Sequence, residues 1–275
     1  MAQMPDAQYR AIQAVNYSGL KLFAESPLHY WHRYLNPDYE QPSESRALLL
    51  GSAIHCRVLE GLAEYSRRYV REGTFNKRTK DGKAAHAEWL SQIGDARPLP
   101  ADDWELVDAV STSVLKSPMA SALLEGAGGH SEEVIQAIDE ETGLMLKGKA
   151  DRIQTVGGKT YLVDLKTCSQ MYGGAGPEGF GKSVARFKYH WQAAFYLDLV
   201  NASGDWGEVD GFVFVVVEKE PPHAVAIYEA SDQMVQVGRD QYREALGRYK
   251  ACFEANEWPG FDSKIVSLEL PRWAV

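Results

Sequence analysis

The stretch GKADRIQTVGGKTYLVDLK, residues 148–166, places Asp151, Asp164 and Lys166 on two short runs that contain apolar residues typical of a core. The Val-Gly-Gly-Lys segment between the runs is typical of a turn, so the stretch is predicted to form a β-hairpin. Residues i and i+2 of a strand face the same side, which puts Asp164 and Lys166 together and Leu165 on the opposite side. The turn would bring Asp151, on the first strand, within reach of Asp164.

Two carboxylates at that separation repel each other unless a positive charge lies between them. A divalent cation would satisfy this requirement, and oxygen ligands favour Mg²⁺, with Mn²⁺ as a substitute, over zinc. Lys166 would then orient or deprotonate a metal-bound water and offset charge in the transition state of phosphodiester hydrolysis. The alternative is an ordinary surface ion pair, because Asp-x-Lys on a strand is very common.

The overall composition is that of a folded globular protein. The chain has 275 residues, of which 45% are apolar and 24% charged. It contains no apolar run of 18 residues and no signal-peptide pattern, so a cytoplasmic protein without a membrane partner is expected. Cys56, Cys168 and Cys252 lie far apart, which argues against disulfides and an iron–sulfur cluster and favours buried, reduced thiols.

The formal charge of −9 argues against indiscriminate nucleic-acid binding, but two local stretches are basic. Residues 67–83 carry seven Lys or Arg against Glu72 and Asp81, and residues 182–190 carry three bases and no acid. Solvated surface is the alternative for either stretch. The candidate DNA-binding residues are Arg67, Arg68, Arg71, Lys77, Arg78, Lys80, Lys182, Arg186 and Lys188.

Periodicity and turn signals predict an α/β (α+β) chain with a helical N-terminal part, about 1–125, and a sheet core, about 130–275. A single domain over residues 1–275 is expected, with a central mixed β-sheet flanked by helices. The predicted helices are 17–35 with a break at Ser26-Pro27, 45–61 ending at Gly61, 83–93, 101–116, 185–202 and 231–256. The predicted strands are 132–138, 144–155, 160–167, 209–219 and 223–230, with a glycine-rich loop over 172–182 and a loop around 74–86.

Four further residues outside the hairpin are candidates for the same site. Glu133 begins the strand before the hairpin, although Glu132 could serve as well. His55 lies on an apolar helix, where a packed core histidine is the alternative interpretation. Gln192 and Tyr196 are four residues apart and therefore share a helix face, from which they could contact a phosphate or Lys166.

The order of His55, Glu133, Asp151, Asp164-Leu165-Lys166 and Gln192-x-x-x-Tyr196 resembles the PD-(D/E)xK nuclease superfamily. Within it, the segments YSGLKLFAESPLHYWHRYL, LLLGSAIHCRVLEG, GKADRI, LVDLKT and HWQAAFYLDL resemble the RecE (exodeoxyribonuclease VIII) and lambda-exonuclease type of phage recombination exonuclease. These segments span residues 17–200. One departure is that Asp151 follows Ala150 and not the proline that gives the superfamily its name.

The resemblance implies a restriction-endonuclease-like fold and Mg²⁺-dependent 5′→3′ digestion of linear double-stranded DNA that leaves 3′ overhangs. It also implies a ring of three or four subunits, a single-strand annealing protein (RecT/Bet type) as partner, and a phage or prophage origin within a bacterial cell. The implied metal ligands are His55, Asp151, Asp164 and the Leu165 carbonyl. Glu133 is implied as a second-metal or water-bridged ligand. Lys166 is the implied catalytic lysine, and Gln192 and Tyr196 complete the pocket.

Two other functions remain open from the residues alone. A structure-specific or restriction-type endonuclease on the same core would cut closed circular DNA, which an exonuclease leaves intact. A catalytically silent DNA-binding module would cut neither circles nor linear DNA. Against this last alternative, the acids, the lysine, the histidine and the Gln/Tyr pair all occur together in the sequence.

Overall fold

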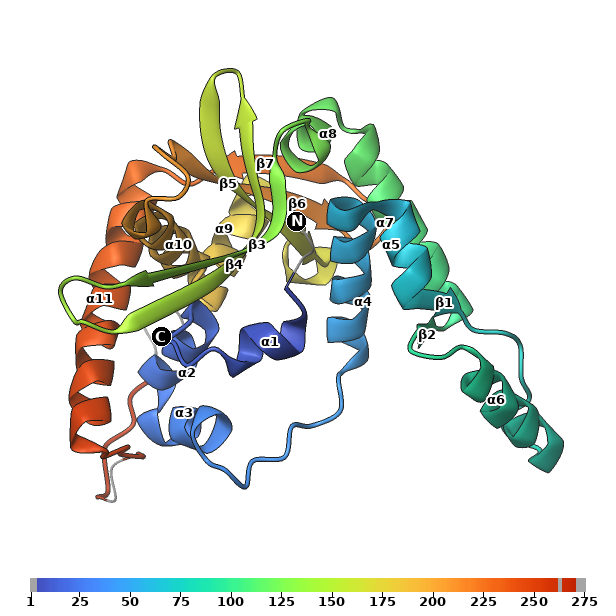
Figure 1. Cartoon of the computed structure of the whole chain (residues 1–275), viewed down its shortest axis with the longest axis horizontal. Helices are drawn as coiled ribbons and strands as arrows, with labels where there is room; N and C mark the ends of the chain where they lie inside the picture. The colour runs from blue at the N-terminus through green and yellow to red at the C-terminus, as the bar shows by residue number, and fades with distance from the viewer. Residues whose placement is uncertain (1–3, 262–263, 271–275) are drawn as a thin grey trace.

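A five-stranded mixed sheet lies at the centre of the molecule, with helices on both faces (Figure 1). The computed structural model describes residues 4–261 and 264–270. Neighbouring strands are antiparallel except β5 and β6, which are parallel because two helices cross over between them. The prediction of a mixed sheet flanked by helices is confirmed. The strands, in sheet order, are β3 (His130–Ile138), β4 (Met145–Val156), β5 (Lys159–Cys168), β6 (Gly211–Glu218) and β7 (Val225–Glu229).

Most of the helices precede the sheet in the chain, as the sequence predicts. The predicted break at Ser26-Pro27 is confirmed, because Ser26 caps the second of two short helices and Pro27 begins it. Two short strands, β1 (Tyr69–Arg71) and β2 (Arg97–Leu99), pair in parallel, and the helix between them in the chain projects from the body (Figure 1). The helices are α1 (Asp6–Ala11), α2 (Tyr17–Glu25), α3 (Pro27–Tyr34), α4 (Arg46–His55), α5 (Gly61–Arg68), the projecting α6 (Lys80–Gln92), α7 (Ala101–Lys116), α8 (Pro118–Glu125), α9 (Pro177–Phe187), α10 (Tyr189–Ser203) and α11 (Asp232–Ala255).

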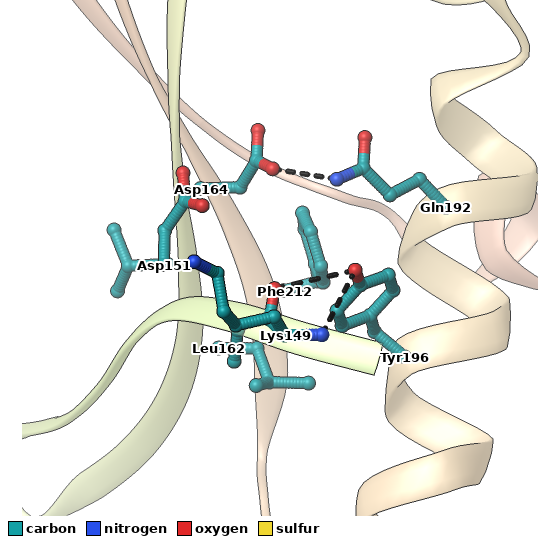
Figure 2. Close-up of a pocket in the computed structure, with 9 residues that line it drawn as sticks. Lys149, Asp151, Leu162, Asp164, Gln192, Tyr196 and Phe212 are labelled. Atoms are coloured by element: carbon teal, nitrogen blue, oxygen red, sulfur yellow. Dashed lines mark hydrogen bonds between the residues drawn. The ribbon is translucent and has the colours of Figure 1, made fainter. Parts of the chain in front are cut away.

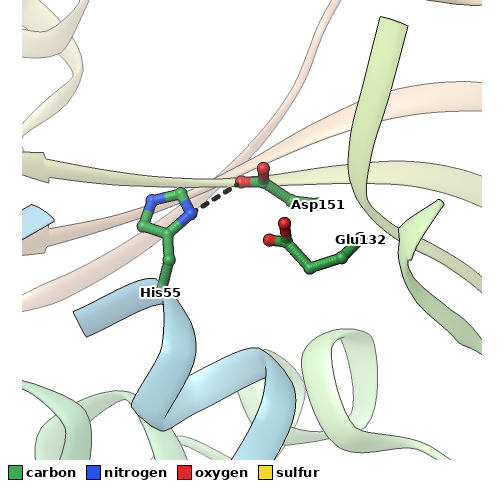
Figure 3. A group of neighbouring side chains, drawn as sticks. All are labelled: His55, Glu132 and Asp151. Carbon is green, nitrogen blue, oxygen red and sulfur yellow. Dashed lines mark ion pairs between the residues drawn. The ribbon is translucent and has the colours of Figure 1, made fainter. Parts of the chain in front are cut away.

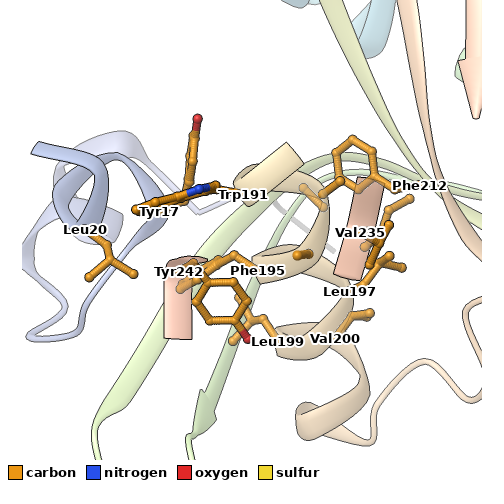
Figure 4. Close-up of a cluster of buried hydrophobic side chains, with 14 of the residues drawn as sticks. Tyr17, Leu20, Trp191, Phe195, Leu197, Leu199, Val200, Phe212, Val235 and Tyr242 are labelled. Atoms are coloured by element: carbon orange, nitrogen blue, oxygen red, sulfur yellow. The ribbon is translucent and has the colours of Figure 1, made fainter. Parts of the chain in front are cut away.

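The central strands β5 and β6 send alternate side chains into two separate apolar cores. Leu162 and Phe214 belong to the core shared with α2, α10 and α11, part of which Figure 4 shows. Val163 and Leu165 belong to the other core, which α4, α7 and α8 complete. Both faces of the central strands are therefore fixed by packing, which explains why β6 reads as a continuous apolar run.

The glycine-rich segment 172–182 was predicted to be a loop leading into a helix over 185–202, and this prediction is wrong in two respects. Helix α9 already begins at Pro177, inside the predicted loop. The predicted helix is two helices, because Lys188 has a left-handed backbone with φ of 58° and ends α9 before α10 begins. The apolar pattern continues through both helices, so it gave no signal of the break.

Two N-terminal segments also differ from their predictions. The helix over 45–61 is α-helical only to His55, after which Cys56–Glu60 form a π-helical turn that ends at Gly61 with φ of 86°. Helix α6 begins at Lys80, within the predicted loop, because the Thr79 hydroxyl caps it.

The three cysteines are free, but only Cys56 is buried, whereas Cys168 and Cys252 are half-buried. Among residues 4–261 and 264–270, none of the helices has the length and apolar character needed to cross a bilayer.

Helix α11 packs against the start of α10 through Gly238. A Cβ at this position would lie 2.1 Å from the carbonyl oxygen of His190, so any larger residue must push the two helices apart. We expect Gly238→Ala to lower the free energy of unfolding by at least about 2 kcal/mol. Gly247→Ala, on the same helix with open space around it, should instead raise it by about 0.5–1 kcal/mol. Urea unfolding followed by circular dichroism measures both, and similar effects of the two substitutions would contradict this packing.

Candidate active site

The candidate site lies where the pairing of β4 with β5 ends (Figure 2). The last paired residues are Arg152 and Val163, so Asp151 and Asp164 follow opposite each other on the two strands. Beyond the last pair, a side chain replaces the backbone as the hydrogen-bond acceptor between the strands. Asp151 Oδ2 accepts a hydrogen bond of 2.9 Å from the Leu165 N–H. The hairpin therefore brings the two aspartates together as the turn predicted.

Asp164 is held at both carboxylate oxygens. Its Oδ1 accepts a hydrogen bond of 2.6 Å from Gln192 Nε2 of α10 (Figure 2). Its Oδ2 lies 2.6 Å from Lys166 Nζ, and within the described chain this buried oxygen accepts no hydrogen bond of normal geometry. The Lys166 ammonium also lies 4.8 Å from the centre of the Tyr189 ring. The predicted same-face arrangement of Asp164 and Lys166 is present, and Gln192 joins it from the helix.

His55, Glu132 and Asp151 form a second group beside the first (Figure 3). One ligand atom from each residue lies within 4.8 Å of the others. His55 is the last α-helical residue of α4, and its Nδ1 lies 3.4 Å from Asp151 Oδ2. Asp151 thus connects the two groups. Asp164 is not a member of this group, because Lys166 and Gln192 hold its carboxylate.

The structure brings Glu132, and not Glu133, into this group. Glu133 pairs with Ala150 across the ladder, and its carboxylate lies 3.6 Å from the His130 ring. Glu132 lies opposite Asp151 and has φ of 59°, a left-handed conformation that typically costs 1–3 kcal/mol in a residue other than glycine. An observed strained residue beside clustered acids is characteristic of a functional site.

The charges in the site depend strongly on one another. Burial, which is the largest cause, and the neighbouring Asp164 and Glu132 carboxylates together raise the pKa of the Asp151 carboxyl to about 6, against the opposing effect of positive neighbours. Burial alone would lower the pKa of Lys166, but Asp164 and Asp151 outweigh it and the pKa is raised. Lys166 is therefore a cation that balances two acids.

Tyr196 fixes the backbone of β4 just before Asp151. Its hydroxyl donates a hydrogen bond of 3.2 Å to the Lys149 carbonyl, and burial raises its pKa well above the usual value. Gly148 permits this contact, since a Cβ there would lie 3.0 Å from the Tyr196 ring. The sequence analysis did not identify Lys149 as a site residue, although its Nζ lies 2.6 Å from Glu132 Oε2. Its position two residues before Asp151, on the same face of the strand, could have indicated this.

The space between these side chains is small. The cavity bounded by β4, β5 and α10 has a volume of about 10 Å³, which is close to that of one water-sized sphere. Asp151 and Asp164 line this cavity, and the Lys166 ammonium lies against Asp164. The two carboxylates and one imidazole of His55, Glu132 and Asp151 form a mostly oxygen donor set, which fits a divalent cation.

The basic residues predicted to contact DNA divide into those for which no ion pair is described and those that pair with an acid. Arg78 and Lys80 are exposed at the start of α6, Arg186 lies over the Tyr172 ring, and Lys188 lies over a tryptophan ring. The others already pair with acids. Where both partners are exposed, as in Arg71–Glu105 and Lys182–Glu178, such pairs are weak enough to exchange partners. The pairs are Arg67–Glu64, Arg68–Glu60, Arg71–Glu105, Lys77–Glu72 and Lys182–Glu178, at 2.5–2.8 Å.

The sheet is that of a PD-(D/E)xK nuclease fold, as the sequence predicted. Residues 16–267 match the family described as PDDEXK-like domain of unknown function (DUF3799), and the chain belongs to this family. No curated protein matches the chain.

Two solved structures were compared with this fold. The crystal structure of a candidate exonuclease from Eubacterium rectale is similar over 98% of this chain and 97% of its own, with a TM-score of 0.62 and 16% sequence identity. At that identity the likeness concerns the fold alone. The protein SSO0001 aligns with 71% of this chain and 86% of its own at 17% identity, and its TM-score of 0.28 is too low to support an argument.

Glu132 and Glu133 provide a matched test of the metal site. Glu132→Gln removes a charge beside His55 and Asp151, and we expect it to weaken Mn²⁺ binding roughly tenfold or more, as loss of a carboxylate ligand does. Glu133→Gln removes the same charge one residue away and should leave the affinity within about twofold. Isothermal titration calorimetry measures both. Equal losses in the two variants would remove Glu132 from the proposed ligand set.

The raised pKa of Asp151 predicts a pH-dependent effect on stability. The folded protein holds the Asp151 proton up to about pH 6, whereas the unfolded chain releases it near pH 4, so the wild type loses stability as pH rises through this window. Asp151→Asn can still accept from the Leu165 N–H. In EDTA we expect this variant to be more stable than the wild type by about 1–3 kcal/mol at pH 8 and by little at pH 4.

Urea unfolding at the two pH values, with EDTA and then with Mg²⁺, measures the effect. Because the cation should stabilise only the wild type, Mg²⁺ should reduce or reverse the difference at pH 8. A wild type that is the more stable protein at pH 8 in EDTA would contradict an electrostatic penalty at Asp151.

Proposed function

We propose that this protein is a Mg²⁺-dependent deoxyribonuclease that digests linear double-stranded DNA from its 5′ ends and leaves 3′ overhangs. The observation that carries the proposal is the meeting of Asp151, Asp164 and Lys166 at the end of the β4–β5 ladder, in a chain of the PDDEXK-like family. Phosphodiester hydrolysis needs a cation-binding set of carboxylates and a positive group at the phosphate, and these residues provide both.

His55, Glu132 and Asp151 would hold the divalent ion, with Asp164 and the Leu165 carbonyl as further donors. Glu132 takes the role that the sequence suggested for Glu133, because only Glu132 is close to the other two. When bound, a divalent ion at this site polarises a phosphoryl oxygen and lowers the pKa of a coordinated water.

The side chains of the protein contribute position and charge. Lys166 is held as a cation by its acidic neighbours, so it offsets negative charge on the phosphoryl oxygens and does not act as a base in this state. Gln192 fixes the Asp164 carboxylate from one side and leaves the second oxygen facing Lys166. Tyr196 keeps β4 in place before Asp151 through the Lys149 carbonyl.

Exonuclease action and the 5′→3′ direction are the finer part of the proposal. They are supported by the resemblance to the RecE and lambda-exonuclease type and by the description of the Eubacterium rectale protein, which shares the fold, as a candidate exonuclease. A ring of three or four subunits, working with a single-strand annealing protein, belongs to the same proposal. A ring would also reconcile a net charge of −9 with DNA binding, because basic residues need line only its channel.

Lys166→Ala tests the proposed chemistry. The substitution removes the ammonium beside Asp164, so we expect cleavage to slow by roughly 10²–10³-fold or more while Mn²⁺ still binds. The substrates are linear duplex, 5′-dephosphorylated linear duplex and closed circular DNA, each with Mg²⁺ and with EDTA. Loss of linear DNA alone, dependent on Mg²⁺ and absent in the variant, is the expected result.

The other results lead to different functions. Cutting of circular DNA by the wild type would replace the exonuclease with an endonuclease. A wild type that binds DNA but cleaves none of the substrates would indicate a binding module on a nuclease fold. Cleavage that Lys166→Ala leaves unchanged would place the chemistry elsewhere in the molecule.

A further inference from the structure

A row of three lysines leads away from Asp164 along the surface of the first apolar core. Lys166 begins the row beside Asp164, Lys21 of α2 is next, and Lys188 stands at the junction of α9 and α10. Each ammonium lies over an aromatic ring, at 4.8 Å from the Tyr189 centroid for Lys166, 5.5 Å from Tyr17 for Lys21 and 4.2 Å from Trp191 for Lys188.

The fold holds this row together from distant parts of the chain. The Tyr17 hydroxyl of α2 donates to the carbonyls of Phe187 and Lys188, at 2.8 and 3.1 Å, where α9 ends. Tyr17 and Trp191 are buried in the same apolar core (Figure 4). The helix that carries Lys21 is therefore tied to the left-handed residue Lys188, and both are fixed relative to the strand that carries Lys166.

Lys21 and Lys188 are half-buried cations without an acidic partner. Within the described residues, neither lies within 4 Å of a carboxylate, although most lysines and arginines around the site are paired. Burial lowers the pKa of both. The positive charges of Lys166 and Lys188 lower the pKa of Lys21 further. Contacts place the three lysines near one another: the Tyr17 ring lies beneath Lys21 and its hydroxyl donates to the Lys188 carbonyl, while the ring of Tyr189, the next residue, lies beneath Lys166.

Glu25, one turn after Lys21 on α2, is the acid whose charge acts on both lysines, and it opposes these shifts without forming an ion pair with either. Partly desolvated, mutually repelling cations lower the stability of the free protein. An anion bound among them would remove that penalty, so the arrangement favours a negatively charged ligand.

We propose that Lys21 and Lys188 bind phosphate groups of the same DNA strand whose scissile phosphate lies at Lys166. This inference rests on the proposed function and adds the path of the cleaved strand, from β5 across α2 to the α9–α10 junction. Lysines suit this role because they attract any backbone phosphate without reading the base.

The test is the salt dependence of DNA binding by the full-length protein. A fluorescent linear duplex is titrated by anisotropy between 50 and 300 mM KCl, with Ca²⁺ to fill carboxylate sites and a gel to verify that the DNA stays intact. Each lost phosphate contact lowers the slope of log affinity against log salt by about 0.9. We expect the double variant Lys21→Gln/Lys188→Gln to lose about 1.8 in slope and to bind roughly ten- to hundredfold more weakly at 100 mM KCl.

Three controls separate lost contacts from lost structure. Lys250→Gln, which removes a lysine of α11 that pairs with Glu254, should leave the slope unchanged. Lys21→Arg/Lys188→Arg keeps both charges and should retain the wild-type slope. Glu25→Gln removes the opposing acid and should tighten binding severalfold. A double Gln variant with the slope of the wild type would overturn the proposal, as would Arg variants that lose as much as the Gln variants.

Two duplexes identify the phosphate that is bound. Equal losses on 5′-phosphorylated and 5′-hydroxyl duplexes indicate internal phosphodiesters, whereas a loss confined to the phosphorylated duplex indicates the terminal phosphate; both support an anion site at the two lysines. Failure of the proposed function gives a different result. If the wild type cleaves no DNA but the double Gln variant has a reduced salt slope, the lysine site is supported and the nuclease function is not. If the wild type cleaves DNA and the double Gln variant keeps the wild-type slope, only the lysine proposal fails.

Discussion

Repulsion between Asp151 and Asp164 is the constraint around which the rest of the site is arranged. Their strands place them opposite each other just where backbone pairing stops, in a partly buried position where two negative charges are mutually unfavourable. Four nearby polar groups lessen that repulsion. Lys166 and Gln192 contact Asp164, while the Leu165 N–H and His55 contact Asp151. A site with fewer of these contacts would hold the aspartates protonated or apart.

Two energetic penalties remain at this site in the folded protein. The raised pKa of Asp151 reports an electrostatic penalty, and the left-handed backbone of Glu132 reports a conformational one. Neither benefits the fold, because Asp151 follows the last β4–β5 pair and Glu132 lies within a β3–β4 ladder that other pairs already define. Apolar cores on both sides of β5 and β6 supply the stability that tolerates them. A divalent cation would relieve the electrostatic penalty, since it satisfies carboxylates that repel each other.

Sequence predicted the parts of the site that depend on local geometry. The two-residue period of a strand placed Asp164 with Lys166, the turn placed Asp151 opposite, and helical spacing placed Gln192 with Tyr196. It could not choose between Glu132 and Glu133, because that choice depends on a left-handed residue within a strand. Nor could it find the break at Lys188, where the apolar pattern continues, or the position of Lys21, whose neighbours come from remote parts of the chain.

Helix α10 connects the site to the core, and its sequence shows how. Gln192 and Tyr196 point from it to β5 and β4, where they hold Asp164 and the Lys149 carbonyl (Figure 2). Trp191 and Phe195, one position earlier in each case, are buried among α2 and α11. The helix is therefore buried on several sides, which explains the aromatic residues around its circumference. Because one rigid helix carries both sets of contacts, a change in how α2 or α11 packs against it would also move the carboxylate that Gln192 holds.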